Sequence, residues 1–250
     1  MLQGHDVLGI AQTGTGKTAA YALPVLMRCK YAQGKNPRAL ILAPTRELVM
    51  QIHEVMVGLA VETDLRMLAL YGGLGPKTQI QALEDGVDIL VSTPGRFLEL
   101  YRKDMIVVKD LKILILDEAD KMMDMGFMPQ IREILEKIPY KKRQNGLFSA
   151  TFPEKVENLS HEFLEFPHKV EITRQATPAS QVTQYVYEAP NLSTKINALA
   201  HFLKQDAFER VMIFCRSKDV ANQVEKFLIR KVLPEDQVRA IHSNKGQNTR

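Results

Sequence analysis

The stretch AQTGTGKT at residues 11–18 has the residue types that a phosphate-binding loop needs. It ends in the G-K-T of the pattern G-x-x-x-x-G-K-[ST], although Ala11 replaces the first glycine of that pattern. Alanine is acceptable there if its φ is negative. Lys17 can reach the β- and γ-phosphates of a nucleotide, and the Thr18 hydroxyl can bind Mg²⁺. The alternative is a glycine turn with an incidental lysine.

The glycines of this loop let backbone N–H groups face an anion, and the following helix adds a favourable dipole. We therefore expect the whole loop to bind ATP phosphates. The expected nucleotide-binding residues are Gln12, Thr13, Gly14, Thr15, Gly16, Lys17 and Thr18.

A second acidic stretch, Asp117-Glu118-Ala119-Asp120, directly follows the apolar run KILIL. Carboxylates at a strand end lie beside the phosphate loop in open α/β sheets. Asp117 is expected to bind Mg²⁺ together with Thr18, and Glu118 to orient and deprotonate a water. With Lys17 these residues form the predicted catalytic set. An ordinary acidic helix start is the alternative, because Asp and Glu favour the first helical turn.

These residues need a parallel sheet to bring them together, and the sequence predicts one. Seven short apolar runs are typical of strands, and several are apolar throughout, as expected for strands buried on both faces. The expected strands are 7–11, 39–44, 67–72, 87–93, 112–118, 146–151 and 169–173. Helical spacing of apolar residues predicts helices from Lys17 to about Met27, over 46–60 and over 129–138. The alternation favours a doubly wound α/β domain.

The amino-acid composition of the chain changes after residue 173. Residues 174–182 are polar and small and predict a linker between a first domain, 1–173, and a second, 183–250. In the second domain we expect strands at 183–189, 210–215 and 237–242 and helices at 193–205 and 218–230.

The composition is ordinary for a globular protein, with 45% hydrophobic and 25% charged residues and a net charge of +4. No apolar run approaches the roughly 18 residues of a membrane span, and residues 1–6 do not resemble a secretory signal. Cys29 and Cys215 have no metal-ligand spacing, so we interpret them as reduced thiols of a cytoplasmic protein.

Seven short motifs make a more specific pattern than the phosphate loop alone. They are AQTGTGKT (11–18), PTREL (44–48), GG (72–73), TPGR (93–96), DEAD (117–120), SAT (149–151) and IFCRS (213–217). In this order they resemble the DEAD-box ATP-dependent RNA helicases of bacterial type, whose phosphate loop commonly begins with alanine. The resemblance implies two RecA-like domains of the P-loop NTPase class, the second one partial here, with ATP and Mg²⁺ as cofactors.

The resemblance also implies which residues contact RNA. In the first domain they are Thr45, Arg46, Gly73, Thr93, Gly95 and Arg96, and in the second they are Ser217, Gln247 and Arg250. Threonine hydroxyls, N–H groups and arginines bind phosphates without distinguishing bases, so binding is expected to be sequence-independent. Turn residues, helix caps and solvated surface are the alternative interpretations.

Three further residues are implied to couple nucleotide state to RNA binding, namely Asp120, Ser149 and Thr151. Asp120 resembles the carboxylate that contacts the second domain when the two domains close. Without the resemblance to this family, we would interpret Ser149 and Thr151 as the end of a strand followed by a threonine helix cap.

Two elements of the family are expected to fall outside these 250 residues. One is an adenine-recognising glutamine with an upstream aromatic residue, before Ala11, and Gln3 lies too close to the loop to replace it. The other is the arginine-finger motif of the second domain. We therefore expect the chain to be truncated at both ends.

Three functions remain open. The first is ATP hydrolysis coupled to RNA binding and local duplex unwinding. The second is a nucleotide- and RNA-binding module with little turnover, because an arginine finger contributes about 10³–10⁵ in rate. The third, a small-molecule kinase or GTPase, would have no reason to contain PTREL, TPGR and SAT.

Overall fold

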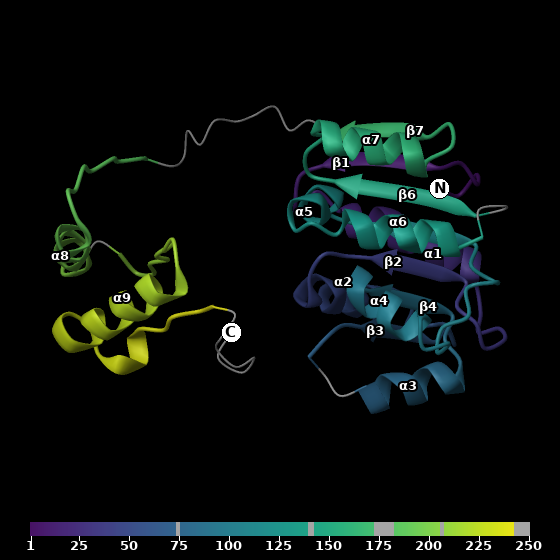
Figure 1. The fold of residues 1–250 in the computed structure, drawn as a ribbon, viewed down its shortest axis with the longest axis horizontal. Helices are drawn as coiled ribbons and strands as arrows, with labels where there is room; N and C mark the ends of the chain where they lie inside the picture. The colour runs from purple at the N-terminus through teal and green to yellow at the C-terminus, as the bar shows by residue number, and fades with distance from the viewer. Residues whose placement is uncertain (74–75, 140–142, 173–182, 206–207, 243–250) are drawn as a thin grey trace. The chain divides into compact units, whose positions relative to one another are not determined.

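The computed structural model describes residues 1–73, 76–139, 143–172, 183–205 and 208–242. It divides into two compact units, Met1–Pro178 and Ala179–Arg250, and the division falls within the predicted linker (Figure 1). Residues 173–182 and 243–250 lie outside the described ones, so the whole predicted linker (174–182) and two of the predicted RNA contacts, Gln247 and Arg250, are not described.

The first unit is built on a seven-stranded sheet in the order β3-β4-β2-β5-β6-β1-β7, and every recorded strand pair is parallel. All seven predicted strands are confirmed, with ends that shift by at most a few residues. They are β1 (Val7–Ala11), β2 (Ala39–Leu42), β3 (Met67–Leu70), β4 (Ile89–Ser92), β5 (Ile113–Leu116), β6 (Gln144–Ser149) and β7 (His168–Ile172).

Seven helices are assigned in the described part of this unit, and three of them match predicted ones. Those three are α1 (Lys17–Cys29), α2 (Arg46–Leu59) and α6 (Met128–Lys137). The other four are α3 (Pro76–Asp85), α4 (Pro94–Tyr101), α5 (Ala119–Asp124) and α7 (Glu154–Phe163). Among the described residues, no helix is long and apolar enough to cross a bilayer.

The central strands of the sheet are buried on both faces, which explains their apolar sequences, whereas the edge strand β7 is exposed. Leu40 and Leu42 of β2 belong to a core that includes residues of α4, α5, α6 and α7, whereas Ile41 faces a second core formed with α1 and α2. Helices thus cover both faces, as Figure 1 shows, and the predicted doubly wound α/β fold is confirmed.

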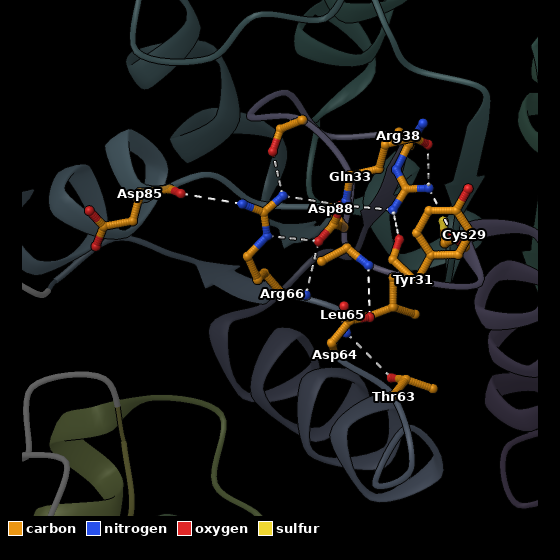
Figure 2. Close-up of polar contacts among 12 residues, drawn as sticks. Cys29, Tyr31, Gln33, Arg38, Thr63, Asp64, Leu65, Arg66, Asp85 and Asp88 are labelled. Atoms are coloured by element: carbon orange, nitrogen blue, oxygen red, sulfur yellow. Dashed lines mark hydrogen bonds and ion pairs between the residues drawn. The ribbon is translucent and has the colours of Figure 1, made fainter.

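The amino-terminal edge of the sheet is held by a buried ion-pair cluster. Asp88, which is fully buried, pairs with Arg38 at 2.7 Å and with Arg66 at 2.9 Å (Figure 2). The backbone N–H groups of Gln33 and Arg66 also donate to its carboxylate. The three charged residues directly precede β4, β2 and β3, so this cluster joins loops at the edge opposite the strands' carboxyl ends.

The second unit contains α8 (Leu192–Leu203), α9 (Lys218–Lys231) and a short 3₁₀ helix, η1 (Glu235–Gln237). Both predicted helices are confirmed. The three predicted strands are wrong: 183–189, 210–215 and 237–242 form no strand. A strand needs a neighbour that completes its hydrogen-bonded ladder, and an apolar run alone does not provide one. Phe214 and Val186 accordingly remain about 90% exposed.

Candidate active site

The predicted site residues of the first unit all lie at or just beyond the carboxyl end of a strand. The phosphate loop follows β1, the DEAD segment follows β5, and SAT begins at the end of β6. PTREL, GG and TPGR follow β2, β3 and β4. Because the strands are parallel, all six segments meet at one edge of the sheet. The strand order places the segments predicted to bind nucleotide on one half of that edge and those predicted to contact RNA, which follow β2, β3 and β4, on the other half.

The phosphate loop has the backbone geometry that an anion cradle requires. Gly14 and Gly16 have φ values of 81° and 88°, a conformation that favours glycine. Gly16 is the N-cap of α1, so the first backbone N–H groups of that helix, which have no partner within the helix, point toward the loop. The Thr15 hydroxyl donates to the carbonyl of Gln12 and closes the turn. Ala11 ends β1 and is not among the residues with positive φ, so its methyl group is tolerated.

Lys17 is the first residue of α1, and its ammonium group lacks a counterpart. Its Nζ is buried, and no hydrogen-bond partner for it is found in the described part of the chain. The charge of Lys17 acts to lower the pKa of Asp117, so the two side chains are near neighbours. A buried ammonium group without a partner is costly unless a ligand pairs with it.

Asp117 is 2% exposed, and each of its carboxylate oxygens accepts a hydrogen bond. The backbone N–H of Glu118 donates to Oδ1 at 2.8 Å, and the Tyr21 hydroxyl donates to Oδ2 at 2.8 Å. Burial raises the pKa of Asp117, whereas the Tyr21 hydrogen bond, the Glu118 amide and the charge of Lys17 act in the opposite direction.

Glu118 adopts a left-handed conformation, with φ 52° and ψ 50°, immediately before α5. Non-glycine residues rarely adopt this conformation, and such strain is concentrated at functional sites. The Glu118 carboxylate forms an ion pair with Lys121 at 2.8 Å, and the Lys121 side chain is more than half exposed. The Glu118 side chain is only 12% exposed, so Lys121 is the member of the pair that can withdraw into solvent and leave Glu118 for another partner.

The three residues predicted to couple nucleotide and RNA binding lie together. Oδ2 of Asp120 accepts from the Thr151 hydroxyl at 2.8 Å and from the Thr151 N–H at 3.0 Å. The Asp120 N–H donates to Ser149 Oγ at 3.2 Å. Burial would raise the pKa of Asp120, but the hydrogen bonds led by the one from the Thr151 hydroxyl outweigh it and lower that pKa.

Thr45, Arg46 and Gly73 form one group on the other half of the edge. Thr45 caps α2, and its hydroxyl oxygen accepts from the Leu48 N–H. The Arg46 guanidinium lies over the ring of Tyr71, 4.6 Å from its centroid, and its Nε is buried with no partner among the described residues. Gly73 approaches the same guanidinium closely, since a Cβ there would lie 3.2 Å from Arg46 Nη1.

TPGR begins α4, and its residues differ in accessibility. Thr93 precedes the helix without a side-chain cap hydrogen bond, and Gly95 is exposed with open space around its Cα. Arg96 is 7% exposed, pairs with Glu99 at 2.7 Å and donates through Nε to Gln79. Its Nη2 is buried and has no partner in the described segments. Arg96 must therefore rearrange to contact a phosphate.

In the second unit, Ser217 is exposed and caps α9, its hydroxyl oxygen accepting from the Val220 N–H. It is the only predicted RNA contact of that unit within the described residues.

Sequence reasoning missed four residues that hold the predicted ones in place. Tyr71, Gln79 and Glu99 contact arginines of the RNA half, and Tyr21 contacts Asp117. Glu99 had a detectable signal, because it lies three residues after Arg96 on one helix. Tyr21 also had one, since a buried tyrosine needs a partner for its hydroxyl.

Comparison with known proteins agrees with this geometry. The profile of the DEAD/DEAH box helicase family matches residues 1–159, which is more than half of the chain. The chain belongs to the DEAD/DEAH box helicase family. It is 40% identical over 237 residues to the ATP-dependent RNA helicase RhlB of Pseudomonas putida, covering 92% of this chain and 59% of that protein. It is 38% identical over 231 residues to the ATP-dependent RNA helicase DeaD of Escherichia coli, covering 92% and 36%.

Among solved structures, the yeast DEAD-box splicing factor Prp28 matches this DEAD-box chain with a TM-score of 0.66 and 30% identity. The match covers 91% of this chain and 55% of the Prp28 chain. The fold is therefore RecA-like, as the motifs predicted. The chain spans about 59% of the length of the first curated relative.

Proposed function

We propose that this chain binds ATP and RNA as part of an ATP-dependent RNA helicase that hydrolyses ATP and separates short duplexes. The observation that carries the proposal is the buried, partnerless Nζ of Lys17 at the N-terminus of α1. A terminal phosphate of ATP supplies the negative charge that Lys17 lacks. The helix dipole and the loop N–H groups favour the same anion.

The residues of this edge also fit Mg²⁺. Asp117 keeps one lone pair on each oxygen after its two hydrogen bonds, and Thr18 offers a hydroxyl oxygen from the first turn of α1. Hard oxygen ligands of this kind suit Mg²⁺, which keeps several waters when it binds with a nucleotide. When bound, Mg²⁺ supplies positive charge to the β- and γ-phosphates.

Glu118 is proposed to accept the proton of the attacking water. It directly follows Asp117, and its largely exposed partner Lys121 can withdraw into solvent and leave the Glu118 carboxylate for a water. Lys17 neutralises developing charge on the phosphates, and the buried position of Asp117 limits competing water around it.

RNA is proposed to contact the half of the edge that follows β2, β3 and β4. Arg46 and the open Gly95 end of α4 offer a guanidinium and backbone N–H groups to phosphates, as does the Thr93 hydroxyl. None of these groups distinguishes one base from another, so we propose sequence-independent backbone binding. Bacterial relatives and free cysteines at positions 29 and 215 support the cytoplasm as the location.

The test compares three forms of the chain: wild type, Lys17→Ala and Glu118→Gln. Binding of a fluorescent ATP analogue with Mg²⁺, and phosphate release with and without single-stranded RNA, are measured for each. We expect Lys17→Ala to lose nucleotide binding and hydrolysis. Glu118→Gln is expected to bind ATP within about twofold of wild type and to lose at least 100-fold in hydrolysis. Glu62→Gln, at an exposed position outside the edge, is the matched control.

Each outcome has a clear meaning. Normal hydrolysis by Glu118→Gln would disprove its role as the base. Nucleotide binding by the wild type without RNA-stimulated phosphate release would leave the chain as a binding module with little turnover.

A further inference from the structure

Tyr21 lies between the two residues proposed to bind Mg²⁺. It follows Thr18 by three residues on α1, so both side chains lie on the same face of the helix. Its side chain is 0% exposed, and its hydroxyl donates to Oδ2 of Asp117 at 2.8 Å. The Thr18 side chain also lies close enough to the phenol to lower the pKa of Tyr21. The phenol therefore bonds one proposed ligand and lies near the other.

Packing explains the ring of Tyr21 but not its hydroxyl. The ring contacts Phe148 of β6 at a centroid distance of 5.1 Å and an interplanar angle of 51°, which is a common aromatic arrangement. A phenylalanine would fill the same space. The hydroxyl is a buried polar group that stabilises the fold only because Asp117 accepts its hydrogen bond.

The hydrogen bond from Tyr21 fixes the orientation of the Asp117 carboxylate. Oδ1 is already held by the backbone N–H of Glu118, so the Tyr21 bond to Oδ2 prevents rotation about the last side-chain bond. The two donors come from different elements, the end of β5 and the middle of α1. Partners of this kind orient metal ligands, and their removal typically costs 10–100-fold in metal affinity.

We propose that Tyr21 is a positioning residue for Mg²⁺, whose hydroxyl orients the Asp117 carboxylate beside Thr18 for binding the metal of the nucleotide. This inference rests on the proposed ATP and Mg²⁺ site and adds a residue to it. Tyr21 acts through Asp117 and does not itself contact the nucleotide.

The test is a Mg²⁺ titration of Tyr21→Phe in the presence of a fluorescent ADP, with nucleotide binding as the readout. We expect the half-saturating Mg²⁺ concentration to rise about 10-fold, while ADP affinity without Mg²⁺ changes less than twofold. In hydrolysis, the same variant should need more Mg²⁺ but approach the wild-type kcat when Mg²⁺ saturates. Tyr101→Phe, which removes a hydroxyl at the end of α4, is the matched control and should behave as wild type.

A double-mutant cycle gives a second, independent measurement. In an Asp117→Asn background, Tyr21→Phe should change the Mg²⁺ requirement less than twofold, because its effect passes through the Asp117 carboxylate.

Three outcomes would overturn the proposal. Equal Mg²⁺ requirements of wild type and Tyr21→Phe would remove the role of Tyr21 and leave the proposed function intact. An equal loss of ADP binding with and without Mg²⁺, or a full effect in the Asp117→Asn background, would show a merely structural role. Absence of Mg²⁺-dependent nucleotide binding in the wild type would overturn the proposed function as well.

Discussion

Asp120 and Thr151 are joined by two hydrogen bonds, one from the Thr151 hydroxyl at 2.8 Å and one from its backbone N–H at 3.0 Å. The first residue begins α5 after β5, and the second lies just beyond β6. The DEAD segment therefore cannot move unless these hydrogen bonds break or the SAT segment moves with it. This connection is the physical basis for the proposed coupling between nucleotide state and RNA binding.

Thr151→Val is expected to weaken that coupling. The substitution keeps the shape of the side chain but removes its hydroxyl, and a hydrogen bond to a carboxylate contributes roughly 1.5–3 kcal/mol. We expect RNA stimulation of phosphate release to fall at least fivefold, with ATP affinity within twofold of wild type. Thr63→Val, whose hydroxyl donates to the Ala60 carbonyl outside the edge, is the control. Unchanged RNA stimulation in Thr151→Val would contradict the coupling role.

The fold of the first unit could largely be predicted from sequence because its central strands are buried on both faces. A strand such as β5, ILIL, has no competing pattern, and Pro94 marks the start of α4. The helices α3 and α7 were not predicted, although the buried residues Val156, Leu159 and Phe163 give α7 a helical spacing that the sequence shows. The strands of the second unit failed for another reason: 210–215 has an apolar strand composition but no paired neighbour.

Local sequence reveals the chemical groups of the site but not their partners. The glycines of the phosphate loop imply its backbone conformation, and the structure has that conformation. DEAD was open to two interpretations, a metal ligand with a general base or an acidic helix start; Asp117 and Glu118 lie before α5 at the predicted edge, and only Asp120 lies in the first turn of that helix. The hydrogen bond between Tyr21 and Asp117 joins residues 96 positions apart, and only the sheet order determines it.

Asp88 is expected to be a major determinant of stability at the edge opposite the site. Asp88→Asn leaves Arg38 buried without its counter-charge, which costs about 3–5 kcal/mol in the free energy of unfolding. Urea denaturation should show this loss, while Asp85→Asn, at an exposed neighbouring position, should change stability by less than about 0.5 kcal/mol. Similar stabilities of the two variants would show that the cluster in Figure 2 is energetically neutral.

The same carboxylate predicts a pH dependence. Burial alone would raise the pKa of Asp88, but hydrogen bonds from Arg66, the Gln33 amide, the Arg66 amide and Arg38 lower it to about 2. The ionised form therefore stabilises the fold fully above the unfolded pKa of about 3.9, and this contribution is lost as the pH falls towards 2. The stability contributed by this carboxylate amounts to roughly 2–3 kcal/mol. Between pH 5 and pH 2.5 the wild type should lose more stability than Asp88→Asn.

Arg46→Ala is expected to weaken RNA binding by a similar factor for every RNA sequence. The guanidinium lies over Tyr71 and next to Gly73, and its buried Nε has no partner in the described part of the chain. Loss of one phosphate contact should lower the slope of log affinity against log salt by about 0.7 for single-stranded RNA. Filter binding or fluorescence anisotropy at several salt concentrations measures both quantities. Arg132→Ala, whose side chain pairs with Glu162 on α7, is the matched control. A loss that differs between RNA sequences, or a salt slope equal to that of wild type, would show that Arg46 does not bind a phosphate.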